Sequence, residues 1–128
     1  MHSKIKLPNP GDIVWFRHPD DSKKRPGVVL GVSKLKHEVI VAFGTSQKTH
    51  KLYPSEFLIA ETDGAEAFAL SGLSHDTKFD LARTCILPFT TEFFAKAPKK
   101  NNIPFPKMGS VHIMYYNAMS KAKAKSNK

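Results

Sequence analysis

Three short runs of β-branched and aromatic residues, each bounded by turn-forming residues, fill the first third of the sequence and constrain its fold most strongly. The runs cover residues 13–16, 28–32 and 38–43. Each run is too short for a stable helix, and its residue types favour the extended backbone of a strand. Pro10 and Gly11 before the first run and Gly44 after the third are typical of turns. We therefore predict three consecutive antiparallel strands.

The middle of the sequence predicts further short strands. Residues 48–53 and 57–60 are candidates, and residues 77–87 read as a strand that Pro88 ends. The alanines of residues 65–73 favour a helix, whereas the length of the segment and its bounding glycines, Gly64 and Gly72, favour a strand. We predict a strand there.

Helical signals come late in the chain. A hydroxyl at Thr90 or Thr91 is predicted to cap a brief helix over residues 92–96. Apolar side chains recur at helical spacing near the C-terminus, which predicts an amphipathic helix near residues 110–122 that begins at a Ser110 cap. The predicted order, with short strands first and helices only near the end of the chain, indicates a mainly β fold. We expect a small and strongly bent antiparallel barrel with peripheral helices.

The length of 128 residues fits one domain. We assign residues 1–119 to the barrel domain and residues 120–128 to a basic C-terminal tail. This tail carries Lys121, Lys123, Lys125 and Lys128 without any apolar side chain larger than alanine. It is either a solvated helix end or a binding arm, and we favour the solvated end.

The charge of the chain concerns its partners more than its fold. Twenty Lys and Arg residues against eleven Asp and Glu residues give a formal net charge of +9, which favours association with nucleic acid, an anionic membrane or an acidic protein. No stretch reaches the ~18 consecutive apolar residues of a membrane span, and the first residues lack the apolar stretch of a signal peptide. We therefore expect a soluble protein of the cytoplasm.

The sequence argues against several kinds of catalytic and metal sites. The single cysteine, Cys85, cannot form an internal disulfide or a zinc site by itself, and its apolar strand predicts a small buried side chain. No two of the six histidines stand at metal-ligand spacing. The GxxxxGK[ST], GxGxxG, HExxH and GxSxG motifs do not occur. We expect neither a metal nor a cofactor.

Polar residues gather where the predicted strands begin and end. They are Lys23, Lys24 and Arg25 before the second strand, Thr45, Ser46 and Gln47 after the third, and Lys78 and Asp80 in the strand of residues 77–87. Strand ends converge in a barrel, where cations and hydroxyls suit phosphate and a carboxylate suits proton transfer. Taken singly, each cluster also fits a solvated loop or a turn.

The order of these pieces resembles the MazF/PemK family of toxin endoribonucleases. The resemblance rests on four motifs in this order: Pro10-Gly11-Asp12-Ile13-Val14-Trp15, Lys24-Arg25-Pro26-Gly27, Gly44-Thr45-Ser46-Gln47 and Lys78-Phe79-Asp80-Leu81-Ala82-Arg83-Thr84. It covers roughly residues 10–87. It implies an SH3-like β-barrel with peripheral helices, a homodimer, and metal-independent cleavage of single-stranded RNA by the toxin of a type II toxin–antitoxin pair. An antitoxin protein would block the basic surface.

The resemblance also implies roles for single residues. Arg25 would contact phosphate near the active site, and Thr45 and Ser46 would help to hold RNA. Asp80 matches the acidic residue and is the candidate base, while Lys78 is the candidate that protonates the leaving oxygen or stabilises its charge. We count Arg25, Lys78, Asp80 and Thr45 as candidate catalytic residues, and Lys23, Lys24, Arg25, Ser46 and Gln47 as candidate RNA-binding residues.

One residue departs from the family pattern. Lys78 stands where relatives carry an arginine, and an ammonium cannot clamp a phosphate with two donors as a guanidinium does. This departure keeps a second hypothesis open, a non-catalytic barrel that binds nucleic acid or an acidic protein. His18 is the nearest counterpart of a histidine that relatives often place in the first loop.

Overall fold

The computed structural model describes residues 3–97 and 107–126. Within these residues the strands are β1 Asp12–Arg17, β2 Lys24–Ser33, β3 Glu38–Thr45, β4 Glu56–Ile59, β5 Thr77–Pro88, β6 Phe94–Ala95 and β7 Lys107–Ser110. The helical elements are η1 Glu61–Asp63, α1 Ala65–Ser71, η2 Ile113–Tyr115 and α2 Tyr116–Ser126. None of the helices in these two ranges is long and apolar enough to cross a membrane.

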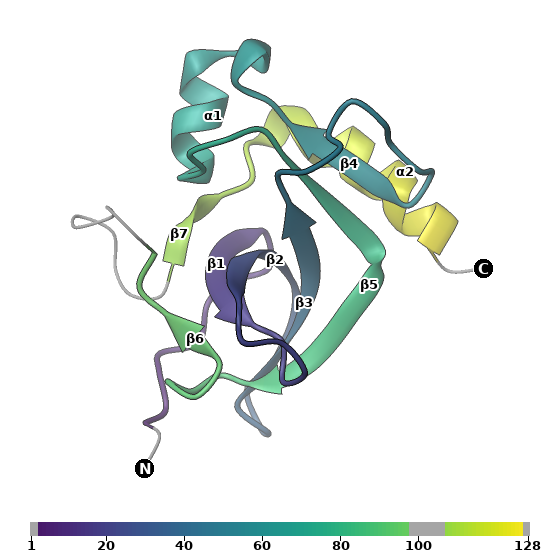
Figure 1. The fold of residues 1–128 in the computed structure, drawn as a ribbon. Helices are drawn as coiled ribbons and strands as arrows, with labels where there is room; N and C mark the ends of the chain where they lie inside the picture. The colour runs from purple at the N-terminus through teal and green to yellow at the C-terminus, as the bar shows by residue number, and fades with distance from the viewer. Residues whose placement is uncertain (1–2, 98–106, 127–128) are drawn as a thin grey trace.

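One antiparallel sheet organises the chain. Its strand order is β4-β5-β3-β2-β1-β6, and β7 also pairs with β1. The sheet curls strongly, so that β1 and β2 lie inside the bend while α1 and α2 lie outside it (Figure 1). The prediction of a mainly β, strongly bent antiparallel fold with peripheral helices is confirmed.

Both faces of the curled sheet bury apolar side chains. Successive residues of a strand point to opposite faces, and here Ile13 and Val14 belong to two different core clusters, as do Val28 and Val29. The first cluster gathers residues of both α-helices and β7, and the second is closed by aromatic residues of the β5–β6 region. The central strands are therefore covered on both sides, which explains why their sequences read as continuous apolar runs.

Five predicted strands are confirmed, at β1, β2, β3, β4 and β5, but the prediction for residues 65–73 is wrong. This segment forms the helix α1, which ends at Gly72 in the left-handed conformation, with φ of 71°. The glycine that we read as a strand boundary is thus a helix C-cap. Residues 48–53 form no strand either, because the chain turns there: Lys48 has a positive φ of 52°, and Lys51 N donates to Lys48 O.

The two late helices also differ from prediction. Residues 92–96 contain the short strand β6, whose Phe94 pairs with Phe16 and is buried in the second core cluster. The C-terminal helix is confirmed, but it starts later. Ser110 belongs to β7 and donates a hydrogen bond to Asp12, and His112 Nδ1 accepts the Met114 amide at the helix start. The helix α2 continues to Ser126.

Gly72 gives a test of this architecture. A Cβ atom there would collide with the carbonyl of Met108 and meet the left-handed backbone as well, whereas Gly11, with φ of 92°, has no atom near its Cβ position. We expect Gly72→Ala to lower the free energy of unfolding by more than about 2 kcal/mol, and Gly11→Ala by about 1 kcal/mol from backbone strain alone. Urea denaturation measures both, and equal losses would contradict the close approach of β7 to α1.

Candidate functional site

The neighbouring strands β2, β3 and β5 bring Arg25, Thr45 and Lys78 together in one row across the sheet. Thr45 of β3 is the direct partner of Lys78 of β5. Arg25 of β2 lies beside Thr45, because both residues line the same small pocket, and the Arg25 guanidinium carbon lies 6.0 Å from the centre of the Phe43 ring on β3. Residues opposite one another share a face of the sheet. Three of the four candidate catalytic residues therefore lie side by side.

A second row runs parallel to the first and contains the fourth candidate. Phe43 of β3 pairs with Asp80 of β5, and Asp80 pairs with Glu56 of β4. Between Ala42 and Phe43 the β3–β5 ladder shifts, because Ala42 pairs with Thr84 while Phe43 pairs with Asp80. Such an irregularity bends a strand and redirects its side chains, and it is common beside functional sites.

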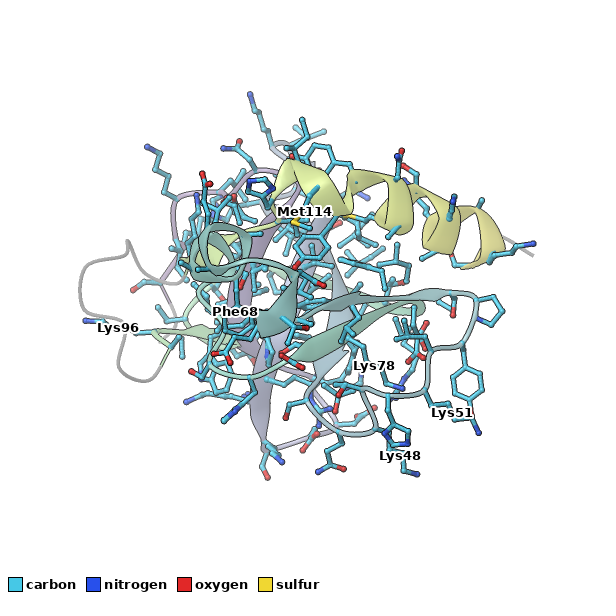
Figure 2. All side chains as sticks on the ribbon, turned by 90° about the horizontal axis from the view of Figure 1, so that it is seen from above. Lys48, Lys51, Phe68, Lys78, Lys96 and Met114 are labelled. Atoms are coloured by element: carbon cyan, nitrogen blue, oxygen red, sulfur yellow. The ribbon has the colours of Figure 1, made fainter. Side chains whose placement is uncertain are left out.

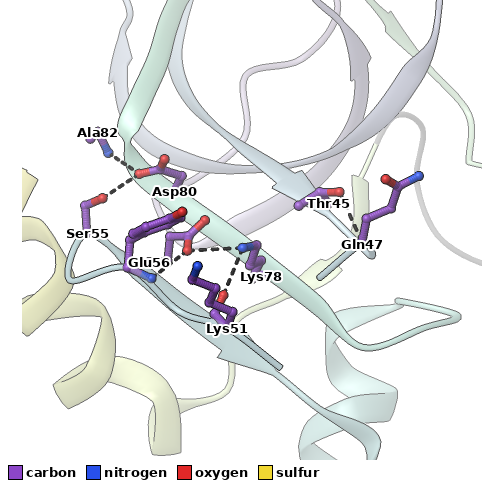
Figure 3. A network of polar contacts seen from close by, with 9 residues as sticks. Thr45, Gln47, Lys51, Ser55, Glu56, Lys78, Asp80 and Ala82 are labelled. Atoms are coloured by element: carbon purple, nitrogen blue, oxygen red, sulfur yellow. Dashed lines mark hydrogen bonds and ion pairs between the residues drawn. The ribbon is translucent and has the colours of Figure 1, made fainter. Parts of the chain in front are cut away.

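Lys78 is buried and forms an ion pair. Its side chain is only 8% exposed, and Nζ lies 3.2 Å from Glu56 Oε1 and 3.0 Å from the carbonyl oxygen of Lys51, to which it donates (Figure 3). Figure 2 shows Lys51 at the edge of the molecule and Lys78 further inside. Glu56 Oε1 also accepts the Tyr53 amide at 2.8 Å. The Lys78 ammonium thus ties the β3–β4 loop to the sheet.

Asp80 is held in place by hydrogen bonds from two sides. Its Oδ1 accepts the Ser55 hydroxyl at 2.8 Å and the Ala82 amide at 2.9 Å (Figure 3). The side chain is half-buried and has a fixed position on the same face of β5 as Lys78. Both hydrogen bonds fix the orientation of the carboxylate.

Arg25 lies against Asp21 and an aromatic ring. Its Nη2 donates to Asp21 Oδ2 at 2.9 Å, and its guanidinium carbon lies 6.0 Å from the centre of the Phe43 ring. Among the described residues no acceptor reaches its buried Nε. The Lys23 amide and the Arg25 guanidinium, which donate to Asp21, hold the pKa of its carboxyl below the ordinary value. Asp21 therefore stays charged and forms an ion pair with the Arg25 guanidinium.

Arg83 lies beside the same aromatic ring. Its guanidinium carbon lies 5.3 Å from the centre of the Phe43 ring, and the side chain is exposed. His18 lies 5.3 Å from that ring as well. Two guanidinium groups and a histidine thus surround Phe43, the cross-strand partner of Asp80.

A small pocket at the end of the β2–β3 ladder brings all the candidate RNA-binding residues together. We call it the basic pocket; it measures about 130 Å³ and is lined by Trp15, Lys23, Lys24, Arg25, Pro26, Gly44, Thr45, Ser46 and Gln47. The Thr45 hydroxyl accepts the Gln47 amide at 3.2 Å, which fixes the turn after β3. The expected convergence of strand ends is present here, although Lys78 and Asp80 do not line this pocket.

Cys85 shows little sign of being a nucleophile. Cys85 is partly buried, and burial raises the pKa of its thiol, which disfavours the nucleophilic thiolate. Across residues 3–97 and 107–126, no three His, Cys, Asp or Glu side chains gather in a group that could hold a metal ion.

Sequence reasoning missed Glu56, Ser55 and Arg83 as members of the site. Glu56 and Ser55 stand more than 20 residues from their partners on β5, and no local pattern links them. Arg83 was within reach, since it belongs to the Arg83-Thr84 part of the motif that begins at Lys78. Trp15 packs on the first core cluster and also lines the basic pocket.

The buried ion pair predicts a specific pattern of stability. Lys78→Met leaves the Glu56 carboxylate buried without its cation, so we expect the free energy of unfolding to fall by about 3 kcal/mol or more. Adding Glu56→Gln removes that charge and keeps an oxygen for the Tyr53 amide, so the double variant should regain at least half of the loss. Chemical denaturation of the two single variants and the double variant measures the coupling, and additive losses would contradict it.

Comparison with known proteins supports the fold. No family model matches the chain, and no curated protein matches it. Among solved structures it is similar to an endoribonuclease in complex with its cognate antitoxin, from a mycobacterial species. The TM-score is 0.63 at 11% sequence identity, and the match covers 94% of this chain and 95% of that chain. The chain therefore has the fold of a toxin endoribonuclease over nearly its whole length.

Proposed function

We propose that this protein is the toxin of a type II toxin–antitoxin pair and cleaves single-stranded RNA without a metal ion. The observation that carries the proposal is that Arg25 and Thr45 line one pocket and that Lys78 lies opposite Thr45, with Asp80 in the adjacent row. The fold shared with an endoribonuclease and the net charge of +9 both support it.

RNA binding would begin at the basic pocket. Lys23, Lys24 and Arg25 attract the phosphate backbone, and such attraction accounts for most sequence-independent binding to nucleic acid. Thr45, Ser46 and Gln47 offer hydroxyl and amide groups to orient the sugar or a base edge. A strand that enters there and continues across the sheet face passes next to Lys78 and Asp80.

The proposed reaction uses the nucleophile that RNA itself carries. Asp80 accepts the proton of a 2′-hydroxyl, and the 2′-oxygen attacks the neighbouring phosphorus. The bond from phosphorus to the 5′-oxygen breaks, and that oxygen takes a proton, for which Lys78 is the candidate donor. Arg25 stabilises the charge that grows on the phosphate. The products are a 2′,3′-cyclic phosphate and a 5′-hydroxyl.

One observation favours a second candidate function, a barrel that binds nucleic acid or an acidic protein without cutting. Glu56 pairs with the Lys78 ammonium, and the ion pair is buried. To act on a leaving oxygen, Lys78 must keep a donor for RNA while it holds Glu56 and the Lys51 carbonyl. An ammonium has three donors, and these contacts use two of them.

The proposed partners follow from charge and fold. An antitoxin would present an acidic segment that folds on binding and places apolar anchors on the toxin. We propose a homodimer in the cytoplasm as the working form of the toxin. Light scattering at micromolar concentration tests the dimer, and a single species of 14.3 kDa would count against it.

Cleavage itself is the decisive measurement. The purified protein, incubated with a long RNA in chelator, should produce new ends that primer extension maps, and a 2′-deoxy nucleotide at a mapped site should abolish the cut there. Asp80→Asn and Lys78→Ala, each compared at a temperature where circular dichroism shows the variant to be folded, should slow cleavage by roughly a hundredfold or more. Glu66→Gln, an exposed carboxylate outside these rows, is the control and should cut like the unaltered protein.

Three outcomes would each contradict part of the proposal. Full activity in folded Asp80→Asn protein removes Asp80 from the reaction. Cutting that survives the 2′-deoxy substitution removes the whole mechanism. RNA binding without any cleavage leaves the binding module in its place.

The ion pair of Arg25 with Asp21 predicts a gain of binding. Asp21→Asn keeps an acceptor for the Lys23 amide but loses the charge beside Arg25, so RNA should bind roughly two- to fivefold more tightly. Asp20→Asn removes an equal charge from an exposed side chain of the same loop and serves as the control. Fluorescence anisotropy with a labelled single-stranded RNA measures both, and equal gains would show that only net charge matters.

A further inference from the structure

A larger pocket adjoins the basic pocket on the side of α1. We call it the α1 pocket; it measures about 470 Å³ and is lined by Ser46, Glu61, Phe68, Ser74, His75 and Asp76. Its volume falls within the range of small-molecule sites. Ser46 lines both pockets, so they meet at the residue that follows β3.

The lining of the α1 pocket differs in charge from that of the basic pocket. Glu61 and Asp76 bring two carboxylates, whereas the basic pocket holds three cations. Carboxylates repel phosphate, so an RNA that spans both pockets would place its phosphate in the basic pocket and an uncharged part in the α1 pocket. The uncharged part of a nucleotide that can leave the backbone is its base.

The carboxylate of Asp76 has a fixed position. Its Oδ1 accepts the Glu61 amide at 2.8 Å, and the side chain is half-buried. Phe68, which Figure 2 marks on α1, is also half-buried and packs against the first core cluster. A fixed carboxylate and a fixed aromatic ring are the two features that recognise an unstacked base, by its edge and by its face.

We propose that the α1 pocket is a base-specificity subsite that takes a nucleobase with an exocyclic amino group. The inference rests on the proposed RNA binding and adds the identity of the base. Carboxylates accept hydrogen bonds from the amino groups of cytosine, adenine and guanine. Uracil has no amino group, and its two carbonyl oxygens flank its one free N–H. The carboxylates of the pocket therefore repel these carbonyl oxygens.

Binding to four short single-stranded RNAs tests the subsite. One is an oligouridine, and the others carry one adenosine, cytidine or guanosine at the same central position. The unaltered protein should bind at least one amino-bearing RNA roughly five- to hundredfold more tightly than oligouridine. In the Glu61→Gln/Asp76→Asn variant this ratio should fall to within about twofold, because amides also donate to the carbonyls of uracil. The side-chain amide oxygen that Asp76→Asn introduces can still accept the Glu61 backbone amide, so the loop should keep its shape.

The readout is the ratio between RNAs, because losing acidic charge raises the affinity for every RNA. Glu66→Gln, on α1 but outside the pocket lining, is the matched control and should leave the ratio unchanged. RNA binding without preference, or a preference that survives in the double variant, overturns the subsite and leaves the proposed function standing. Failure to bind any of the four RNAs overturns both.

Discussion

The ladder between β3 and β5 is the constraint on which the rest of the structure depends. It joins the first three strands to the later part of the chain, and its pairs run from Glu38 with Pro88 to Thr45 with Lys78. Its irregularity at Phe43 leaves residues between Asp80 and Thr84 without partners on β3, which bends β5 and brings Arg83 to the Phe43 ring. The same ladder therefore closes the core and aligns the candidate site.

The site takes its rigidity from ion pairs and hydrogen bonds that the protein itself supplies. Glu56 holds Lys78, Asp21 holds Arg25, and the Ser55 hydroxyl and Ala82 amide hold Asp80. Burial makes the Lys78–Glu56 pair costly to break, whereas the Arg25–Asp21 pair is more exposed and exchanges its partner more easily. The two cations of the row thus differ in how readily each could exchange its carboxylate partner for a phosphate. Arg25 is the better placed to bind one, and Lys78 is tied to the structure of the β3–β4 loop.

Under the proposed function, the two pockets would have different roles in RNA binding. Positive charge collects a phosphate backbone of any sequence, while a pocket with fixed acceptors distinguishes bases. In this chain the basic pocket and the α1 pocket meet at Ser46, so one nucleotide step would carry a strand from the first to the second. Helix α1, whose residues we predicted as a strand, supplies Phe68 to this arrangement.

The sequence by itself determined the strand-rich first third, the strand of residues 77–87, the basic charge and the residues gathered at the strand ends, because these follow from local residue preferences and composition. It misassigned residues 65–73, since a glycine bounds a strand and caps a helix equally well until the chain around it is known. Only the tertiary structure decided that Lys78 meets Glu56, that Arg25, Thr45 and Lys78 form one row, and that Ser46 joins two pockets. These contacts join residues far apart in the chain, and the strand register that creates them is set by packing on both faces of the curled sheet, which no local pattern encodes.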